Sequence, residues 1–157
     1  MKRDRFKFVL WATASVSIAI LIFMFSSQNG EASGSVSQGI TRRIFPSVLS
    51  DDVVFVLEKI IRKLAHYGIY FALGVAVCMS QKCFLSGFFG KRAGNILQIS
   101  VPVAICFLYA VTDEIHQSYM PGRNGAFSDC VLDTFGAFCG VITVVLILHI
   151  LKKAKRK

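Results

Sequence analysis

Four long apolar stretches alternate with polar segments along this chain, at about 8–25, 64–80, 96–112 and 131–151. Each stretch approaches the roughly 20 residues that a helix needs to cross about 30 Å of hydrocarbon. The pattern therefore predicts an all-α fold, a multi-pass transmembrane helical bundle with four spans and short interfacial helices. Residues 1–157 are short enough to form one such unit, so we expect a single domain.

The segment between the first two spans has a different pattern. Residues 26–37 are rich in Ser, Gly, Asn and Gln, which predicts a loop. Residues 36–45 suit a short surface helix that Pro46 would stop. Apolar positions then recur at helical spacing over 53–64, so we expect an interfacial helix that leads into the second span.

The first apolar stretch follows a basic start, which is compatible with a membrane anchor or with a signal peptide. A signal peptide has an apolar core of about 7–15 residues, and the stretch at 8–25 is longer. The small residues at 32–34 resemble a cleavage site, but the length of the stretch favours an uncleaved anchor.

The composition supports a membrane protein. Hydrophobic residues make up 54% of the chain, charged residues only 17%, and the mean hydropathy is +0.59, which is too apolar for an ordinary soluble domain. The net charge of +9 comes from bases just outside the apolar stretches. This placement favours membrane lipids and argues against a nucleic-acid partner. The cysteines form no CxxC pair and indicate buried small residues rather than a zinc site or disulfide framework.

The distribution of charge predicts an orientation. The net charge is +3 before the first span, +3 between the second and third, and +5 after the fourth. It is +1 over residues 26–63 and −3 over residues 113–133. Because basic loops stay in the cytoplasm, both termini are expected there and the acidic run is expected to face outward.

Polar and small residues share one face on each of three predicted spans, because they recur at steps of three and four. The faces consist of Lys63, His66, Tyr70 and Gly74 on the second span, Tyr109, Asp113, His116 and Gln117 on the third, and Asp129, Asp133, Gly136 and Gly140 on the fourth. The polar end of each face lies at the predicted outer surface, so three helices are expected to converge on one outward-facing pocket. Gly136 and Gly140 form a small-xxx-small pair that allows close helix packing.

Asp113 and Glu114 lie near the predicted C-terminus of the third span, where the helix dipole disfavours acids by a few tenths to about 1 kcal/mol each. Candidates for a compensating cation are Lys63, Arg62, Arg123 and a protonated His66. Residues 120–123, Met-Pro-Gly-Arg, have the pattern of a type II turn that would fold Arg123 back over the acids. The planar fork of arginine suits carboxylate or phosphate.

These residues predict an anion-binding site that also carries acid–base groups. The expected catalytic residues are Asp113, Glu114 and His66, and the expected substrate-binding residues are Lys63, Gln117, Arg123, Asp129 and Asp133. Structural alternatives exist for several of them. Ser128 and Asp129 suit a cap of the fourth span, Lys63 suits a structural ion pair with Asp113 or Glu114, and His66 suits a hydrogen-bonded interfacial histidine.

Metal binding is an alternative, because imidazole and carboxylate groups are hard or intermediate ligands. No fixed spacing such as HExxH supports it, so the sequence assigns no metal and no cofactor. A Ser-His-Asp triad also lacks support, because the chain has no nucleophile elbow.

The order of several short motifs resembles the VanZ-like membrane proteins. The motifs are Phe25-Ser26-Ser27-Gln28, Lys63-Leu64-Ala65-His66-Tyr67, Asp113-Glu114-Ile115-His116-Gln117, Pro121-Gly122-Arg123 and Ser128-Asp129-Cys130-Val131-Leu132-Asp133-Thr134-Phe135-Gly136. Each motif is weak alone, but their order and spacing match the family from about residue 8 to residue 140. Many members have Asn where this chain has Asp133, so the acid adds a charge here.

The resemblance implies a multi-pass protein of the bacterial cell membrane. The founding member of the family is associated with low-level resistance to the glycopeptide teicoplanin, although many members occur outside resistance clusters. Two functions then compete. In the first, the outward-facing site binds or processes a lipid-linked anionic envelope molecule, such as a cell-wall precursor. Alternatively, a non-enzymatic protein limits glycopeptide access through steric or partner contacts. A transporter is a third option, and four helices are compatible with a homo-oligomer, but no broken-helix pair or repeat supports transport.

Overall fold

The computed structural model describes residues 2–28, 30–44, 50–89, 95–123 and 125–155. These residues contain five helices and no strand, so the predicted all-α class is confirmed. The helices are α1 (Lys2–Ser26), α2 (Gly30–Ile44), α3 (Asp51–Phe89), α4 (Asn95–Ser118) and α5 (Phe127–Ala154).

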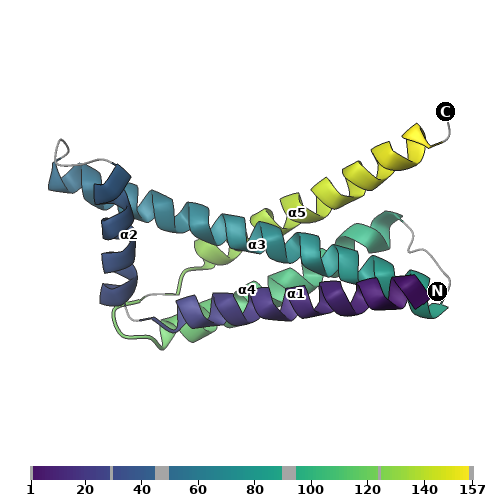
Figure 1. The fold of residues 1–157 in the computed structure, drawn as a ribbon. Coiled ribbons are helices and arrows are strands. Elements are labelled where there is room, and N and C mark those ends of the chain that lie inside the picture. The colour runs from purple at the N-terminus through teal and green to yellow at the C-terminus, as the bar shows by residue number, and fades with distance from the viewer. Residues whose placement is uncertain (1, 29, 45–49, 90–94, 124, 156–157) are drawn as a thin grey trace.

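The predicted four spans correspond to α1, α3, α4 and α5, each of which is long and apolar enough to cross a membrane. In Figure 1 the N- and C-terminal ends of the chain lie at the same end of the bundle. The opposite end carries α2, the first turns of α3 and the connection from α4 to α5. Because α3 packs against each of the other four helices, it is the central element of the fold.

The position of α2 corrects one prediction from the sequence. The pattern over residues 26–37 predicts a loop, but α2 begins at Gly30, so most of that segment is helical. Packing of α2 against α3 and the complete burial of Thr41 explain the difference. Tertiary contacts stabilise a helix that its Gly- and Ser-rich sequence would not form alone. The predicted end of this helix at Phe45 and Pro46 lies outside the described residues.

The predicted interfacial helix and second span form the single continuous helix α3. With 39 residues and a rise of 1.5 Å per residue, α3 is about 58 Å long. This length is about twice the roughly 30 Å thickness of the hydrocarbon layer. One part of α3 therefore extends beyond the span. The N-terminal part of α3, which begins with Asp51 and Asp52, lies at the end of the bundle opposite the termini (Figure 1).

Small and medium-sized side chains form the core between the helices. The largest buried cluster consists of Ile22, Tyr70, Leu73, Cys106, Ala110, Cys130 and Ala137. Four of the five cysteines are buried, which confirms their predicted role as small core residues. Small side chains allow the helix axes to approach closely, and close packing stabilises helices in lipid, where the solvent is as apolar as the core.

Glycines on both partners form the contact between α3 and α5. A Cβ atom added to Gly74 would collide with the carbonyl of Ala137, and one added to Gly140 would collide with the carbonyl of Phe71. Gly136 faces the carbonyl of Tyr67 in the same way. The predicted small-xxx-small pair therefore lies in a helix–helix contact, and it sets the distance between the polar faces of α3 and α5.

Two glycines of α3 provide a matched test of this contact. Gly74→Ala should lower the free energy of unfolding by about 1–3 kcal/mol, because the added methyl group meets backbone atoms that must move. Gly68→Ala should leave that free energy unchanged or raise it by up to about 1 kcal/mol, since its Cβ meets open space and alanine favours helix. Unfolding in mixed micelles, followed by circular dichroism, measures both. Equal changes in the free energy of unfolding for the two variants would contradict a close α3–α5 contact at Gly74.

Polar contacts hold α1 along the bundle. At its N-terminal end, the Arg5 Nε donates to the carbonyl of Gly87 at 3.0 Å, and the hydroxyl of Ser86 donates to Asp4 at 2.8 Å. Further along, the Tyr109 hydroxyl donates to the carbonyl of Ala19 at 2.6 Å. These contacts place the C-terminal end of α1, including Ser26, against the polar end of α4.

Candidate functional site

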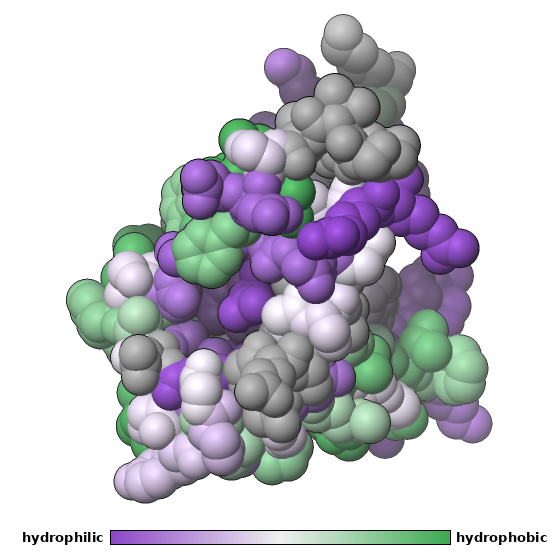
Figure 2. Space-filling view, turned by 90° about the vertical axis from the view of Figure 1, so that its left-hand side faces the viewer, coloured by the Kyte–Doolittle hydropathy of each residue, from purple (hydrophilic) through white to green (hydrophobic). Residues whose placement is uncertain are grey.

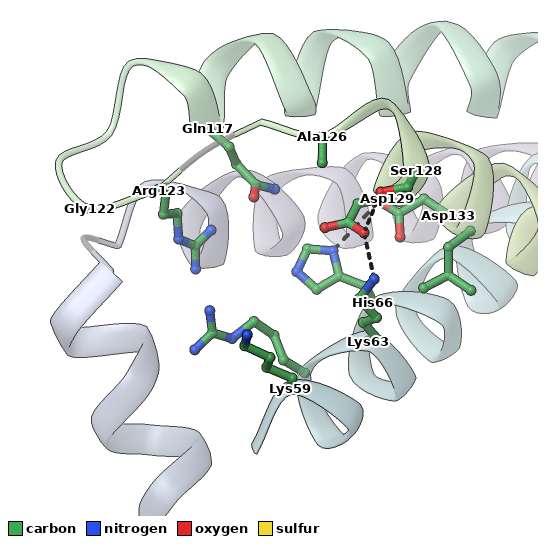
Figure 3. A pocket seen from close by; sticks show the side chains of 12 residues that line it. Lys59, Lys63, His66, Gln117, Gly122, Arg123, Ala126, Ser128, Asp129 and Asp133 are labelled. Atoms are coloured by element: carbon green, nitrogen blue, oxygen red, sulfur yellow. Dashed lines mark hydrogen bonds and ion pairs between the residues drawn. The ribbon is translucent and has the colours of Figure 1, made fainter. Parts of the chain in front are cut away.

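A cavity of about 380 Å³ lies where residues 59–66 of α3, the end of α4 and the start of α5 meet. It is lined by Lys59, Arg62, Lys63, His66, Gln117, Gly122, Arg123, Ala126, Ser128, Asp129, Leu132 and Asp133. Figure 3 shows the labelled side chains directed toward one space from three sides. Figure 2 looks onto this end of the molecule, where hydrophilic residues gather toward the middle of the face and hydrophobic residues lie at its sides. The predicted convergence of three helices on one pocket is therefore observed.

Six of the eight predicted site residues line this cavity, namely His66, Lys63, Gln117, Arg123, Asp129 and Asp133. Asp113 and Glu114 do not; both are buried behind the lining. Lys59 was missed by the sequence reasoning. It lies one helical turn before Lys63 and two before His66, so extending the polar face of α3 toward its N-terminus would have found it.

Basic groups outnumber acids around the cavity. The lining contains four bases, Lys59, Arg62, Lys63 and Arg123, and two acids. Lys63 is neutralised by Asp129, whose Oδ1 lies 3.0 Å from its Nζ. Within the part of the chain that the structure describes, the buried Nε atoms of Arg62 and Arg123 have no hydrogen-bond partner. Two guanidinium groups therefore border the cavity, and the buried Nε of each makes no hydrogen bond among the described residues.

The pair Lys63–Asp129 corrects the expected pairing of Lys63 with Asp113 or Glu114. Both partners are part-exposed, so the ion pair contributes at most about 1 kcal/mol to stability. Its main consequence is geometric, because it joins α3 to the first turn of α5 at the wall of the cavity (Figure 3).

Asp113 is held by neutral donors rather than by a cation. Its Oδ2 accepts hydrogen bonds from the Tyr70 hydroxyl at 3.3 Å and from the Gln117 amide at 3.0 Å. Gln117 also approaches the hydroxyl of Ser26 at 3.2 Å. The expectation of a cationic partner is therefore wrong for Asp113 among the described residues. The other oxygen, Oδ1, is buried without a hydrogen-bond partner.

Glu114 connects α4 to the start of α5. Its Oε2 accepts a hydrogen bond from the backbone N–H of Ala126 at 2.8 Å. Ala126 is the N-cap of α5, and no side chain caps the helix there. The proposed capping role of Ser128 and Asp129 is therefore wrong. Asp129 does lie in the first turn of α5, where its charge suits the helix dipole.

The predicted turn at residues 120–123 is confirmed. The Arg123 N–H donates to the Met120 carbonyl at 3.2 Å, and Gly122 has the positive φ of 72° that the third position of a type II turn requires. Among the described residues, the guanidinium of Arg123 forms no ion pair with the acids, contrary to the expectation; its Nη1 donates to the Ser26 carbonyl at 3.4 Å. Burial lowers the pKa of Arg123, and the nearby Arg62 lowers it further, so the two cations share one region.

His66 and Asp133 face each other at the wall of the cavity. The Nδ1 of His66 lies 3.5 Å from the Oδ2 of Asp133, at ion-pair distance but without a hydrogen bond. Asp133 is completely buried. His116, in contrast, lies away from the cavity, where its ring stacks on Phe23 and its Nε2 lies 3.1 Å from the Ser27 hydroxyl.

The fold and the cavity define a multi-pass helical membrane protein with a basic pocket at one end of its bundle. The family described as VanZ/LLP1 matches residues 11–149, which is nearly the whole chain. The chain belongs to this family, as its motifs indicated. Comparison with curated proteins and with solved structures gave no match.

Proposed function

We propose that this protein binds a lipid-linked anionic molecule of the bacterial envelope, and that a phosphate or similar headgroup occupies the basic cavity. The observation that carries the proposal is the pair of half-buried arginines, Arg62 and Arg123, that line the cavity and whose buried Nε atoms make no hydrogen bond in the described part of the chain. Arginine binds phosphate through two parallel hydrogen bonds, and burial strengthens such contacts.

The position of the cavity supports a lipid-linked ligand. It lies at the ends of α4 and α5, which is headgroup depth for helices that span the bilayer. The aromatic side chains of Tyr119 and Phe127, next to these ends, are exposed to the surroundings. Aromatic residues are typical of the membrane–water interface. A ligand with a polar head and an acyl or prenyl tail would match this boundary.

The proposed orientation places the cavity at the outer face of the cell membrane. Both chain ends lie at the opposite end of the bundle (Figure 1). The basic N-terminal segment and tail put that opposite end in the cytoplasm by the positive-inside rule. A cavity on the outer face would meet envelope precursors after they cross the membrane.

The structure favours binding over catalysis by Asp113 and Glu114, because neither lines the cavity. The alternative function is a non-enzymatic one, in which the protein limits access of a lipid-tailed glycopeptide through steric or partner contacts. Under that alternative, conservative changes inside the cavity should not alter resistance at equal protein abundance.

Expression in a glycopeptide-susceptible Gram-positive host tests the proposal. We expect the inhibitory concentration of teicoplanin to rise, Arg123→Lys to remove the rise, and Arg43→Lys to retain it. Lysine keeps the charge but loses the fork, and Arg43 is an exposed arginine of α2 outside the cavity lining. Vancomycin serves as the reference drug, and immunoblots verify equal abundance.

Resistance that survives Arg123→Lys would favour the steric alternative. If the wild-type protein gives no rise, the ligand would be a native envelope lipid unrelated to glycopeptides. Lipid analysis of cells lacking the protein would then decide, because unchanged pools of envelope lipids and precursors would contradict binding.

A further inference from the structure

Three potential metal ligands from three different helices meet beside the basic cavity. His66 of α3, Asp113 of α4 and Asp133 of α5 each offer a ligand atom, and these atoms all lie within 4.8 Å of one another. His66 and Asp133 form part of the cavity wall, and Asp113 lies behind them. Figure 3 shows His66 and Asp133 directed toward each other from α3 and α5.

Among the described residues, no hydrogen bond satisfies the potential ligand atoms of this cluster. Asp133 is completely buried, and neither of its carboxylate oxygens accepts a hydrogen bond. The Oδ1 of Asp113 and the Nδ1 of His66 are buried without hydrogen-bond partners as well, although this Nδ1 lies 3.5 Å from the Oδ2 of Asp133. Burying a carboxylate without donors or a counter-charge is unfavourable. A protonated His66 would balance only one of the two carboxylates.

We propose that His66, Asp113 and Asp133 bind a divalent transition-metal ion of the Zn²⁺ or Mn²⁺ type. Two carboxylates neutralise the charge of such an ion, and a neutral imidazole completes a three-residue set that leaves a position open toward the cavity. Imidazole favours transition metals over Ca²⁺ or Mg²⁺, which take oxygen ligands. The site is independent of the ligand proposed for the cavity.

The hydrogen bonds around Asp113 fit a metal ligand. Tyr70 and Gln117 both donate to its Oδ2, which fixes the carboxylate and leaves Oδ1 for an ion. Such outer hydrogen bonds orient metal ligands in proteins. In a tetrahedral site, two ligand atoms at about 2.1 Å from one ion are about 3.4 Å apart. The ligand atoms here lie within 4.8 Å of one another, so the widest pair needs to close by up to about 1.4 Å on metal binding, which requires side-chain rotation.

Metal content measured on the purified full-length protein tests the site. The protein would carry an affinity tag without histidines, be stripped with EDTA, dialysed against buffered low-micromolar Zn²⁺ or Mn²⁺, and analysed by plasma mass spectrometry. We expect close to one ion per chain for the wild type. Asp133→Asn should retain at least tenfold less metal under the same conditions. Asp129→Asn is the matched control, because it removes a carboxylate one turn away that lies outside the cluster; it should retain the wild-type amount.

A wild type that retains no more metal than Asp133→Asn would overturn the site and leave an ordinary histidine–carboxylate pair. Equal loss in both variants would also overturn it, since binding would then be nonspecific. If Asp133→Asn does not fold, Co²⁺ bound to the wild type provides a second measurement. Visible absorption bands that Zn²⁺ abolishes are expected, and their absence would contradict the proposal. Neither assay involves the lipid, so failure here leaves the function proposed for the cavity untouched.

Discussion

Replacement of both Arg62 and Arg123 by glutamine is expected to weaken the binding of a phosphate-headed lipid at least tenfold. Both guanidinium groups line the same cavity, and their Nε donors are unpaired among the described residues. A hydrogen bond to a charged group contributes about 1.5–3 kcal/mol, and about 1.4 kcal/mol corresponds to a factor of ten in affinity. We therefore expect the loss of both groups to lower the affinity for the lipid at least tenfold, even after solvent screening weakens each contact.

The measurement compares two lipids that differ in charge alone. Protein in nanodiscs would be titrated with a polyprenyl phosphate and with the uncharged polyprenol, and native mass spectrometry would quantify the bound lipid. Wild-type protein should prefer the phosphate, and the double variant should lose that preference. The double variant Arg42→Gln/Arg43→Gln is the control, since both arginines lie on α2 outside the cavity lining. Equal binding of both lipids by the wild type would remove the support for an anionic headgroup.

Asp113→Leu is expected to lower the free energy of unfolding by about 3 kcal/mol. The change leaves the Tyr70 hydroxyl and the Gln117 amide without their buried acceptor. Each unsatisfied buried donor costs about 1–3 kcal/mol. Unfolding would be followed in mixed micelles with EDTA present, so that a bound metal does not contribute to the difference.

Two further variants separate the causes of this loss. Asp113→Asn keeps an acceptor oxygen and should cost less than the leucine change. Asp129→Leu removes a part-exposed carboxylate that pairs with Lys63, and should cost no more than about 1 kcal/mol. If all three variants unfold alike, the hydrogen bonds to Asp113 contribute little to stability.

The spans and their polar faces could be predicted from sequence because both follow from local spacing. Apolar length identifies a membrane helix, and steps of three and four place His66 with Tyr70, or Asp129 with Asp133, on one side. The turn at residues 120–123 was predictable for the same reason, since proline and glycine restrict the backbone locally.

The contacts of each polar side chain could not be predicted from sequence, because they depend on how the helices are rotated and on the path of the chain between them. Lys63 contacts Asp129 rather than an acid of α4 because the glycine contact between α3 and α5 brings the polar faces of these two helices together. Glu114 reaches the backbone of Ala126 because the chain turns back at residues 120–123. The start of α2 was missed for a related reason, since its packing on α3 outweighs the low helix propensity of its sequence.

Assembly of the cavity from α3, α4 and α5 has a consequence for the biogenesis of this protein. Synthesis from the N-terminus delivers α5 after α3 and α4, so Lys63 and His66 leave the ribosome before Asp129 and Asp133 do. Lys63 and His66 lack these partners until then. A chain that stops before α5 would keep three membrane helices and no site. The cavity is therefore complete only after α5 has packed against α3 and α4.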